Sequence, residues 1–546
     1  MDWLEHLMNK SKQTAVLRGA DYMVAYLQRD PVKHIDSVLR VLSSLDALFG
    51  NKGRMRAFMD WINANPGSRQ WFTRVMSRDP GQVSAFVRNF LGNSCLKWMK
   101  LSGDIIDTYG FCPPYNILIS PTMRCNLACE GCYAQGFPMN EELDAAVMEK
   151  IITEGKSLGV FFYTILGGEP FLRFDDLEKL AARHSDCLFQ VFTNGTLFDD
   201  EVARRLAELK NVLPVFSIGG SCEETERTRG KGVYEKVLDA MAQLRRRDLI
   251  FGISLTMTAR NYATIMSEAF LRFWQDQGVL FGWNFLFMPV GMHADLDLMP
   301  SPEARAAFGE FIKAYREREP LFIMDFFSDA PALGGCIAAG RRFLHINARG
   351  DIEPCIFAHF ATHNIKECTL IEALQSPFFT FIRMQQPHTD NLLRPCMIID
   401  NPGVLREACR RYHARPTEPG AEVLISDPDF MQAIDHYASR TAQVIDPLWQ
   451  SKYRDKIAAM SERRRSYSEG IDRIAYRHER FDLLERIRCW ARGNTIFAHA
   501  MLDGLEFARH ELSTVKQPAQ ADNHCAHAHA REEENPASQT LNNLFT

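Results

Sequence analysis

The chain has 546 residues, 46% of them hydrophobic, and a formal net charge of −5. This length predicts several domains with sizeable cores, and the slightly acidic balance gives no electrostatic case for a nucleic-acid partner. The N-terminal residues lack the apolar core of a secretory signal, and the longest apolar stretch, residues 278–292, is too short to cross a bilayer. We therefore expect a cytoplasmic protein without a transmembrane segment, whose clustered cysteines serve metal or redox chemistry rather than disulfides.

Residues 1–111 carry apolar positions at three- and four-residue spacings, which predict an N-terminal helical domain. Helices are expected to start at Pro31, Pro66 and Pro80, each of which follows Asp or Asn. The helical pattern then gives way to short apolar runs, so a second domain is expected to begin at residue 112.

Residues 112–300 alternate apolar runs with amphipathic segments, which predicts parallel βαβ units with right-handed crossovers. The fold class is therefore α/β, a partial (β/α)6 TIM-like barrel whose functional groups lie at the C-terminal ends of the strands. The six expected strands are "NILIS", "FFYTIL", "CLFQVFT", "LPVFSI", "FGISLTM" and "GWNFLFM".

Three further segments follow the barrel. Residues 301–425 contain additional cysteines, residues 426–512 are predicted to be helical, and residues 513–546 form a polar tail predicted to be disordered. The helical flanks have three interpretations: a lid or apolar channel for a large substrate, a surface for a carrier or peptide, or simple support of the barrel.

Three cysteines crowd the loop after the first expected strand. Cys125, Cys129 and Cys132 lie in "PTMRCNLACEGCYAQG" with the spacing C-x3-C-x2-C, and that loop contains no fourth cysteine or histidine. Structural zinc sites and iron–sulfur clusters are both normally held by four ligands. Three thiolates on a four-iron cluster would leave one iron open, as chemistry at the metal requires.

This loop resembles the signature of the radical S-adenosylmethionine (SAM) superfamily, and later strand ends resemble the same family. "LGGEP" ends the second expected strand, "FTNGT" the third and "FSIGG" the fourth. The resemblance implies that Glu169 contacts the methionine amine, Ser217 the ribose and Tyr133 the adenine. The acidic residue common after the serine is here Gly219. The residues that the resemblance assigns to SAM are Tyr133, Gly167, Gly168, Glu169, Thr193, Asn194, Ser217 and Arg229.

A member of this family would bind a [4Fe-4S] cluster and SAM, cleave SAM reductively and abstract hydrogen from an unactivated C–H bond of an organic substrate. Its electron donor would be of the flavodoxin or ferredoxin type. The alternative of another class is a structural iron–sulfur or zinc protein without catalysis. Within the enzyme class, peptide or protein modification competes with radical C–C coupling or functionalisation of a lipid or isoprenoid chain.

A second group of cysteines resembles the auxiliary-cluster extensions called SPASM and twitch. Cys336 and Cys355 stand in the arrangement C-x13-G-x4-C, and Cys396 is the natural third ligand of a second iron–sulfur cluster. The fourth ligand is open between Cys368, His359 and an exogenous group such as the substrate. The intervening "FLHINARGDIEPC" is predicted to form a hairpin.

The remaining candidates have simpler interpretations. Met288, His293 and Asp325 are predicted substrate contacts, because the loop at the end of the sixth expected strand lies where substrate should enter; core packing explains Met288 equally well. The histidine-rich run 524–530 lies in the polar tail and is expected to have no function. Six cysteines are expected to be small buried hydrophobic residues: Cys95, Cys112, Cys187, Cys222, Cys409 and Cys489.

Overall fold

The structure is a computed structural model that describes residues 24–37, 62, 65–134, 137–138, 140–291 and 294–455. Its main sheet has the strand order β7-β6-β5-β4-β3-β2-β1-β8-β9. All neighbours from β7 to β8 are parallel, and only β9 is antiparallel to its partner. The strands are β1 (Asn116–Ile119), β2 (Phe162–Ile165), β3 (Leu188–Thr193), β4 (Val212–Ile218), β5 (Gly252–Met257), β6 (Phe281–Leu286), β7 (Phe322–Asp325), β8 (Phe343–Ile346) and β9 (Ile352–Glu353).

The predicted partial barrel is confirmed, and its sheet is larger than the six strands that we expected. Strand β7 adds to β6, and β8 pairs in parallel with β1 on the other side of the sheet. The sheet thus continues past residue 300, because the partner of β8 lies more than 200 residues earlier in the chain, where no local pattern reveals it. The division of the chain into domains stays a prediction.

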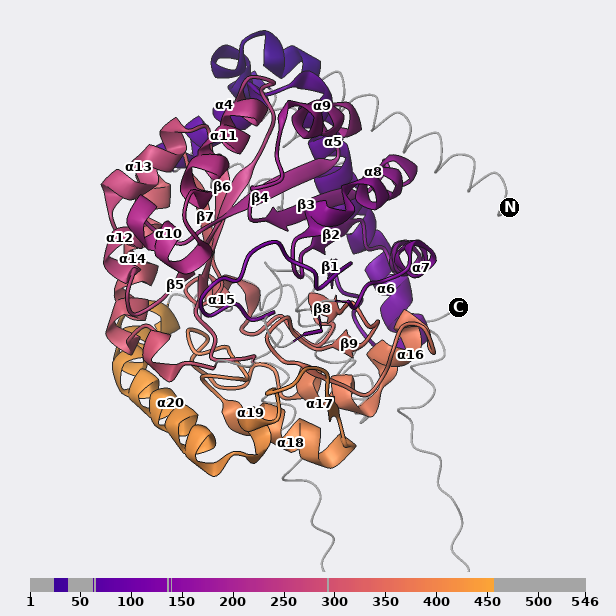
Figure 1. The fold of residues 1–546 in the computed structure, drawn as a ribbon, viewed down its shortest axis with the longest axis vertical. Helices are drawn as coiled ribbons and strands as arrows, with labels where there is room; N and C mark the ends of the chain where they lie inside the picture. The colour runs from indigo at the N-terminus through magenta and orange to yellow at the C-terminus, as the bar shows by residue number, and fades with distance from the viewer. Residues whose placement is uncertain are drawn as a thin grey trace, which may run out of the picture.

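Helices cover the outer face of the sheet (Figure 1). The helical segment before β6 is interrupted after Ile265, and Ser267 caps a new helix by accepting from the backbone N–H of Phe270. The helices between strands are α7 (Ala145–Ser157), η2 (Pro170–Arg173), α8 (Phe174–Arg183), α9 (Asp200–Leu209), α10 (Cys222–Arg229), α11 (Val233–Arg245), α12 (Tyr262–Ile265), α13 (Glu268–Asp276), η3 (Leu296–Leu298), α14 (Pro302–Arg318) and α15 (Ala330–Leu333).

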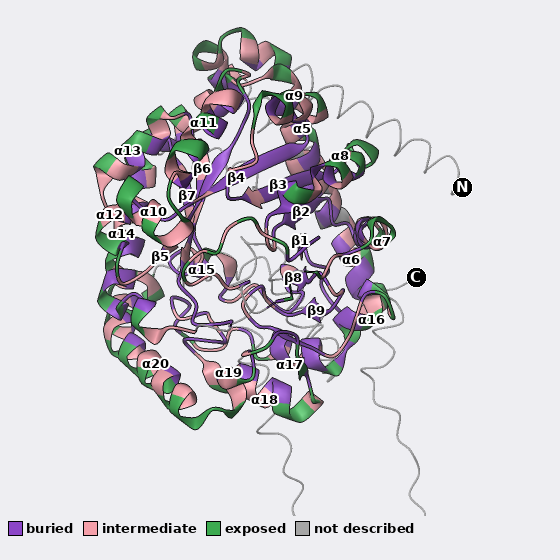
Figure 2. Ribbon diagram, viewed as in Figure 1, coloured by how far each residue is buried: buried purple, intermediate pink, exposed green. Residues whose placement is uncertain are grey.

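The strands of the sheet are the most buried part of the molecule, whereas the outer helices alternate buried and exposed residues (Figure 2). Parallel strands covered on both faces read as nearly continuous apolar runs, which is why these strands were recognisable in the sequence. The core therefore sits between the sheet and its helices.

The N-terminal helices pack against the N-terminal ends of the strands. Phe72 and Val83 share an apolar cluster with Leu188 and Leu280, and the indole of Trp71 donates to the carbonyl of Leu280 at 2.7 Å. This end of the barrel is thereby closed by helices, two of which start at the predicted prolines 66 and 80. These helices are α4 (Pro66–Met76), α5 (Pro80–Phe86), the π-helix η1 (Val87–Lys97) and α6 (Trp98–Tyr109).

The region after the barrel begins with the predicted hairpin, β8 and β9, whose turn contains Gly350 at φ +94°. It continues into helices that gather at the end of the molecule away from α4 (Figure 1). Residues 456–546, with Cys489 and the run 524–530, lie outside the described residues. The later elements are β10 (Phe360–Ala361), α16 (Leu370–Gln375), α17 (Pro377–Met384), α18 (Pro402–Tyr412), β11 (Arg415–Pro416), α19 (Val423–Ser426), α20 (Pro428–Leu448) and η4 (Trp449–Tyr453).

Within the described ranges, none of the helices combines the length and the apolar character that crossing a bilayer demands.

Candidate active site

Cys125, Cys129 and Cys132 follow β1 and line a cavity of about 1060 Å³ inside the barrel. Burial, helped by the neighbouring Cys129, raises the pKa of the Cys132 thiol to about 11. Thiols held together in this way favour a cation, because a bound metal stabilises the thiolates that burial and mutual repulsion disfavour. The three thiols therefore fit an iron–sulfur cluster by their chemistry and by their shared cavity.

The glycines after β2 let the cysteine loop lie directly on the strand end. The backbone N–H of Gly168 donates to the carbonyl of Thr122 at 3.0 Å, and that of Glu169 donates to the carbonyl of Arg124 at 2.8 Å. A Cβ atom on Gly168 would lie 2.1 Å from the Arg124 oxygen. Only glycine permits this approach, so the pair Gly167–Gly168 sets the position of the loop.

Glu169 is not among the residues that line the cavity, and the expected contact of its carboxylate with the methionine amine stays a prediction. Its side chain is 1% exposed and accepts hydrogen bonds from the Thr193 hydroxyl at 2.8 Å and the Asn194 backbone N–H at 2.7 Å. The backbone N–H of Phe171 donates to the same carboxylate at 3.0 Å. Glu169 thus ties the end of β2 to the end of β3.

Asn194 connects the end of β3 to the cysteine loop. Its Nδ2 lies 3.8 Å from the Sγ of Cys125 and donates to the Oδ1 of Asn126 at 2.8 Å. Hydrogen bonds to cluster sulfurs are one of the means by which a protein tunes the reduction potential. Asn194 therefore lies beside the thiol that it can influence, and both Thr193 and Asn194 line the cavity.

Ser217, Arg229 and Tyr133 also line the cavity, as expected of residues that contact SAM. The Nε of Arg229 is buried without a hydrogen-bond partner among the described residues, and its charge lowers the pKa of Cys132 against the larger effect of burial. The Tyr133 hydroxyl lies 3.5 Å from the carbonyl of Gly167. Gly219 takes the place of the acidic residue that the resemblance leads one to expect. A side chain at this position would clash, since a Cβ on Gly219 would lie 2.5 Å from the Thr228 hydroxyl.

The second group of cysteines faces the same cavity. Cys336, Cys355 and Cys396 all line it, although they come from three separate segments of the chain. Burial, helped by the nearby Cys336, raises the pKa of Cys355 to about 12. Beneath them, Asp400 accepts from the backbone N–H of Cys396 at 3.1 Å. The three predicted auxiliary ligands thus all lie on the wall of one cavity, and their role as ligands stays a prediction.

Neither protein candidate for a fourth auxiliary ligand joins these three. The Sγ of Cys368 donates to the carbonyl of Asn364 at 3.2 Å, and the residue does not line the cavity. His359 is fully buried between Glu353 and Glu418, each 3.5 Å from one of its ring nitrogens. Among the residues that the structure describes, no three His, Cys, Asp or Glu side chains converge as ligands of a single metal ion.

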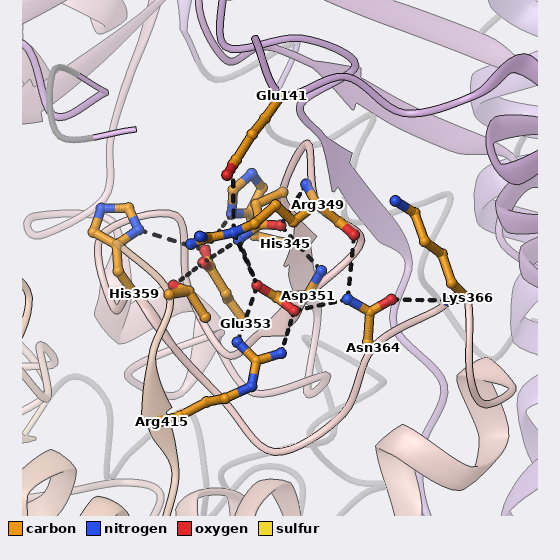
Figure 3. A network of polar contacts seen from close by, with 11 residues as sticks. Glu141, His345, Arg349, Asp351, Glu353, His359, Asn364, Lys366 and Arg415 are labelled. Carbon is orange, nitrogen blue, oxygen red and sulfur yellow. Dashed lines mark hydrogen bonds and ion pairs between the residues drawn. The ribbon is translucent and has the colours of Figure 1, made fainter. Parts of the chain in front are cut away.

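A buried polar network joins the barrel to the hairpin (Figure 3). His345 contacts Ser120 through Nε2 at 2.8 Å and Glu353 through Nδ1 at 2.6 Å. Burial would raise the pKa of Glu353, but His345 and then His359 lower it to about 2. Because Ser120 directly follows β1, this network fixes the start of the cysteine loop to the region that carries Cys355.

Of the predicted substrate contacts, Met288 and Asp325 line the cavity, and His293 lies outside the described residues. Asp325 is buried at the end of β7 and accepts from the Asn284 amide at 3.0 Å and the Ser328 backbone N–H at 2.9 Å. Met288 is 5% exposed and lines the cavity, so its position fits both core packing and contact with a ligand.

Four aromatic side chains form part of the cavity wall, and they were not predicted from the sequence. Phe285 lies 5.3 Å from Phe326 and 6.3 Å from Phe357, and Phe357 lies 5.8 Å from Tyr133 (ring centroids). All four rings line the cavity between the two groups of cysteines. The alternating pattern "GWNFLF" in β6 could have predicted part of this wall, since Trp283 and Phe285 lie on the same face of the strand.

Three of the remaining cysteines, Cys112, Cys187 and Cys409, are buried as predicted. Cys222 is exposed, so this prediction was wrong; it is the first residue of α10, on the outer side of the barrel. Cys95 is half-buried and lines the cavity.

A barrel with a three-cysteine loop after its first strand defines the radical SAM class, and comparison with known proteins agrees. Residues 119–267 match the model of the Radical SAM superfamily. The matched segment contains the three-cysteine loop and strands β2 to β5, and the cofactors of that superfamily are a [4Fe-4S] cluster and SAM.

Curated relatives include the mycofactocin maturase MftC of Mycobacterium tuberculosis (strain ATCC 25618 / H37Rv), 29% identical over 261 residues, with 45% of this chain and 66% of that protein covered. The PqqA peptide cyclase of Xanthomonas oryzae pv. oryzae (strain MAFF 311018) is 28% identical, with 44% and 68% covered. The Fe-coproporphyrin III synthase of Methanosarcina barkeri (strain Fusaro / DSM 804) is 32% identical, with 26% and 37% covered. The chain spans less than two thirds of the length of the first relatives that it matches.

Among solved structures, Streptococcus suis SuiB bound to S-adenosylmethionine aligns with a TM-score of 0.46 and 18% identity, over 58% of this chain and 88% of that one.

Proposed function

We propose that Cys125, Cys129 and Cys132 hold a [4Fe-4S] cluster with which the chain cleaves SAM reductively and abstracts hydrogen from an unactivated C–H bond. The observation that carries this proposal is the meeting of three thiols with the SAM-type strand ends at one cavity. When bound, the cluster supplies the electron that breaks a C–S bond of SAM. The polypeptide supplies position, electrostatics and exclusion of water.

Each part of the site has a proposed role in holding SAM. Arg229, whose Nε is buried, offers its guanidinium to the carboxylate of SAM, and Ser217 offers a hydroxyl to the ribose. Tyr133 offers its ring to the adenine. Glu169 acts as a positioning residue, since its carboxylate is fully engaged in joining two strand ends. Asn194 donates to the sulfur of Cys125 and tunes its electron density.

This proposal is tested by anaerobic reconstitution with iron and sulfide, followed by dithionite and SAM. We expect 5′-deoxyadenosine to form, and to be lost in Cys129→Ala. Absence of 5′-deoxyadenosine from a chain that carries the full complement of iron would refute the enzyme and favour a structural iron–sulfur protein.

We further propose that Cys336, Cys355 and Cys396 hold a second cluster, as in SPASM and twitch extensions. Support comes from the convergence of these thiols on the cavity, with the Asp400 carboxylate bonded to the backbone of Cys396. The double variant Cys336→Ala/Cys355→Ala should then lose about four irons per chain. Cys368→Ala is the matched control and should keep them all; unchanged iron in the double variant would contradict the second cluster.

For the substrate we propose a peptide or protein, which the names of two relatives support, a mycofactocin maturase and a PqqA peptide cyclase. The apolar walls of the cavity favour a second candidate, a lipid or isoprenoid chain. Mass spectrometry of peptides and lipids from cells with and without the gene separates the two. We also infer a cytoplasmic location and an electron donor of the flavodoxin or ferredoxin type.

A further inference from the structure

The cavity does not stop at the cysteine loop but continues down the inside of the barrel. It is lined there by residues of β1 to β3, and at its far end by Ser94 and Trp98 from the N-terminal helices. Since those helices close this end of the barrel, the deep part is a pocket with a floor. Its lining combines aromatic side chains such as Phe90 and Trp98 with polar ones, among them Arg342, whose guanidinium lies 5.6 Å from the centroid of the Trp98 ring.

Three of these polar side chains come from the neighbouring strands β1, β2 and β3 and are here called the polar rung: Asn116, Thr164 and Gln190. The Nδ2 of Asn116 donates to the Thr164 hydroxyl at 2.9 Å. Thr164 and Gln190 are paired in the register of β2 and β3, so their side chains point to the same face. All three line the cavity, and their exposed fractions are 9%, 5% and 2%.

The polar rung has hydrogen-bonding capacity that the protein does not use. The Oδ1 of Asn116 and the Oε1 of Gln190 are buried without a partner among the described residues. The Nε1 of Trp283 on β6, another residue of the cavity wall, is also buried without a partner among the described residues. The Trp283 ring stacks on Phe326 with 5.2 Å between the ring centroids. A buried polar atom without a partner costs about 1–3 kcal/mol, so groups of this kind are normally satisfied by something.

We propose that the polar rung is a binding subsite for an uncharged amide-type group, which the substrate carries into the barrel ahead of its reacting carbon. The side chains of the rung are neutral amides and a hydroxyl, which both donate and accept, and the aromatic walls favour a planar group beside them. A charged group would lose its hydration there without gaining an ion partner from the rung.

The depth of the subsite sets the reach of the substrate. Thr164 lies in β2, three residues before Gly167, and three residues span at most about 10 Å. The amide-type group therefore binds at most about 10 Å below Gly167, on which the cysteine loop rests. The assignment of this ligand group to the substrate rests on the proposed function, whereas the binding itself does not.

The test uses the full-length, anaerobically reconstituted chain with SAM and three probes of one shape: benzamide, acetophenone and benzoate. Acetophenone lacks the N–H donors, and benzoate carries a charge. Equilibrium dialysis should show benzamide binding at least about tenfold more tightly than either analogue. Equal binding of the three probes, tighter binding of benzoate, or no saturable binding of benzamide (a cavity that holds water only) would overturn the proposal.

Variants locate the binding. Gln190→Met and Asn116→Leu keep the approximate shape of each side chain and should abolish the preference for benzamide. Gln243→Met is the matched control, because Gln243 Oε1 is also buried without a partner among the described residues, yet Gln243 does not line the cavity. Retained preference in both rung variants would place the ligand elsewhere. Formation of 5′-deoxyadenosine in the same wild-type sample tests the proposed function separately, since benzamide binding does not require it.

Discussion

Replacing Gly168 by alanine would place a methyl group inside the backbone of the cysteine loop. The added Cβ would lie 2.1 Å from the Arg124 oxygen and 2.7 Å from the Met123 carbonyl carbon, whereas ordinary contact begins at 3.4 Å. The loop would have to retreat by more than about 1 Å, at a cost of about 1–3 kcal/mol in the free energy of unfolding. Hydrogen bonds from the backbone of Gly168 to Thr122 and of Glu169 to Arg124 would weaken with it.

A displacement of about 1 Å at the reacting centre lowers catalytic rates about 100-fold. We therefore expect Gly168→Ala to form 5′-deoxyadenosine about 100-fold more slowly, with its iron retained because all three thiols remain. The assay is a single-turnover measurement of 5′-deoxyadenosine together with iron analysis. Gly103→Ala is the matched control, since nothing lies within 4 Å of its added Cβ. A wild-type rate in Gly168→Ala would refute the reasoning about the loop.

Three further predictions concern potential, stability and pH. Asn194→Leu removes the donor to Cys125 and should make the potential of the SAM cluster more negative in an EPR redox titration; an unchanged potential would exclude that role. Asp400→Ala leaves the buried Arg305 without its 2.6 Å partner and should lower the free energy of unfolding in urea by about 3–5 kcal/mol. Burial raises the pKa of Glu418 to about 7, so its ionisation costs the folded state stability as pH rises from about 4.5 to 7. Glu418→Gln should therefore gain about 3 kcal/mol in urea unfolding at pH 8.5 and almost nothing at pH 4; an equal gain at both would contradict this pKa.

The parts of the fold that the sequence predicted are those written in local patterns. Apolar runs between amphipathic segments revealed β1 to β6, and the turn around Gly350 revealed the hairpin of β8 and β9. The pairing of β8 with β1 was not predicted, because the two strands lie more than 200 residues apart in the chain. The residue pattern of a strand does not indicate which other strand it pairs with.

The parts of the site that could be predicted from the sequence are those in which the spacing of residues in a motif indicates their chemical role. The loop of Cys125, the glycines after β2 and the residues Ser217 and Arg229 were found by motif, and all line the cavity. The direction of the Glu169 side chain was not predictable, because it depends on donors at the end of the next strand. The polar rung was missed for a related reason: which side chains of a barrel strand meet a cavity depends on register and on the packing of the N-terminal helices.

The most direct measurement of the account is the EPR spectrum of the reduced cluster with and without SAM, in the full-length chain carrying Cys336→Ala and Cys396→Ala. If the cysteine loop leaves one iron without a protein ligand, adding SAM should change the spectrum. Cys129→Ala should abolish this change. Zinc in the loop, or a reduced cluster whose spectrum is the same with and without SAM, would contradict the account.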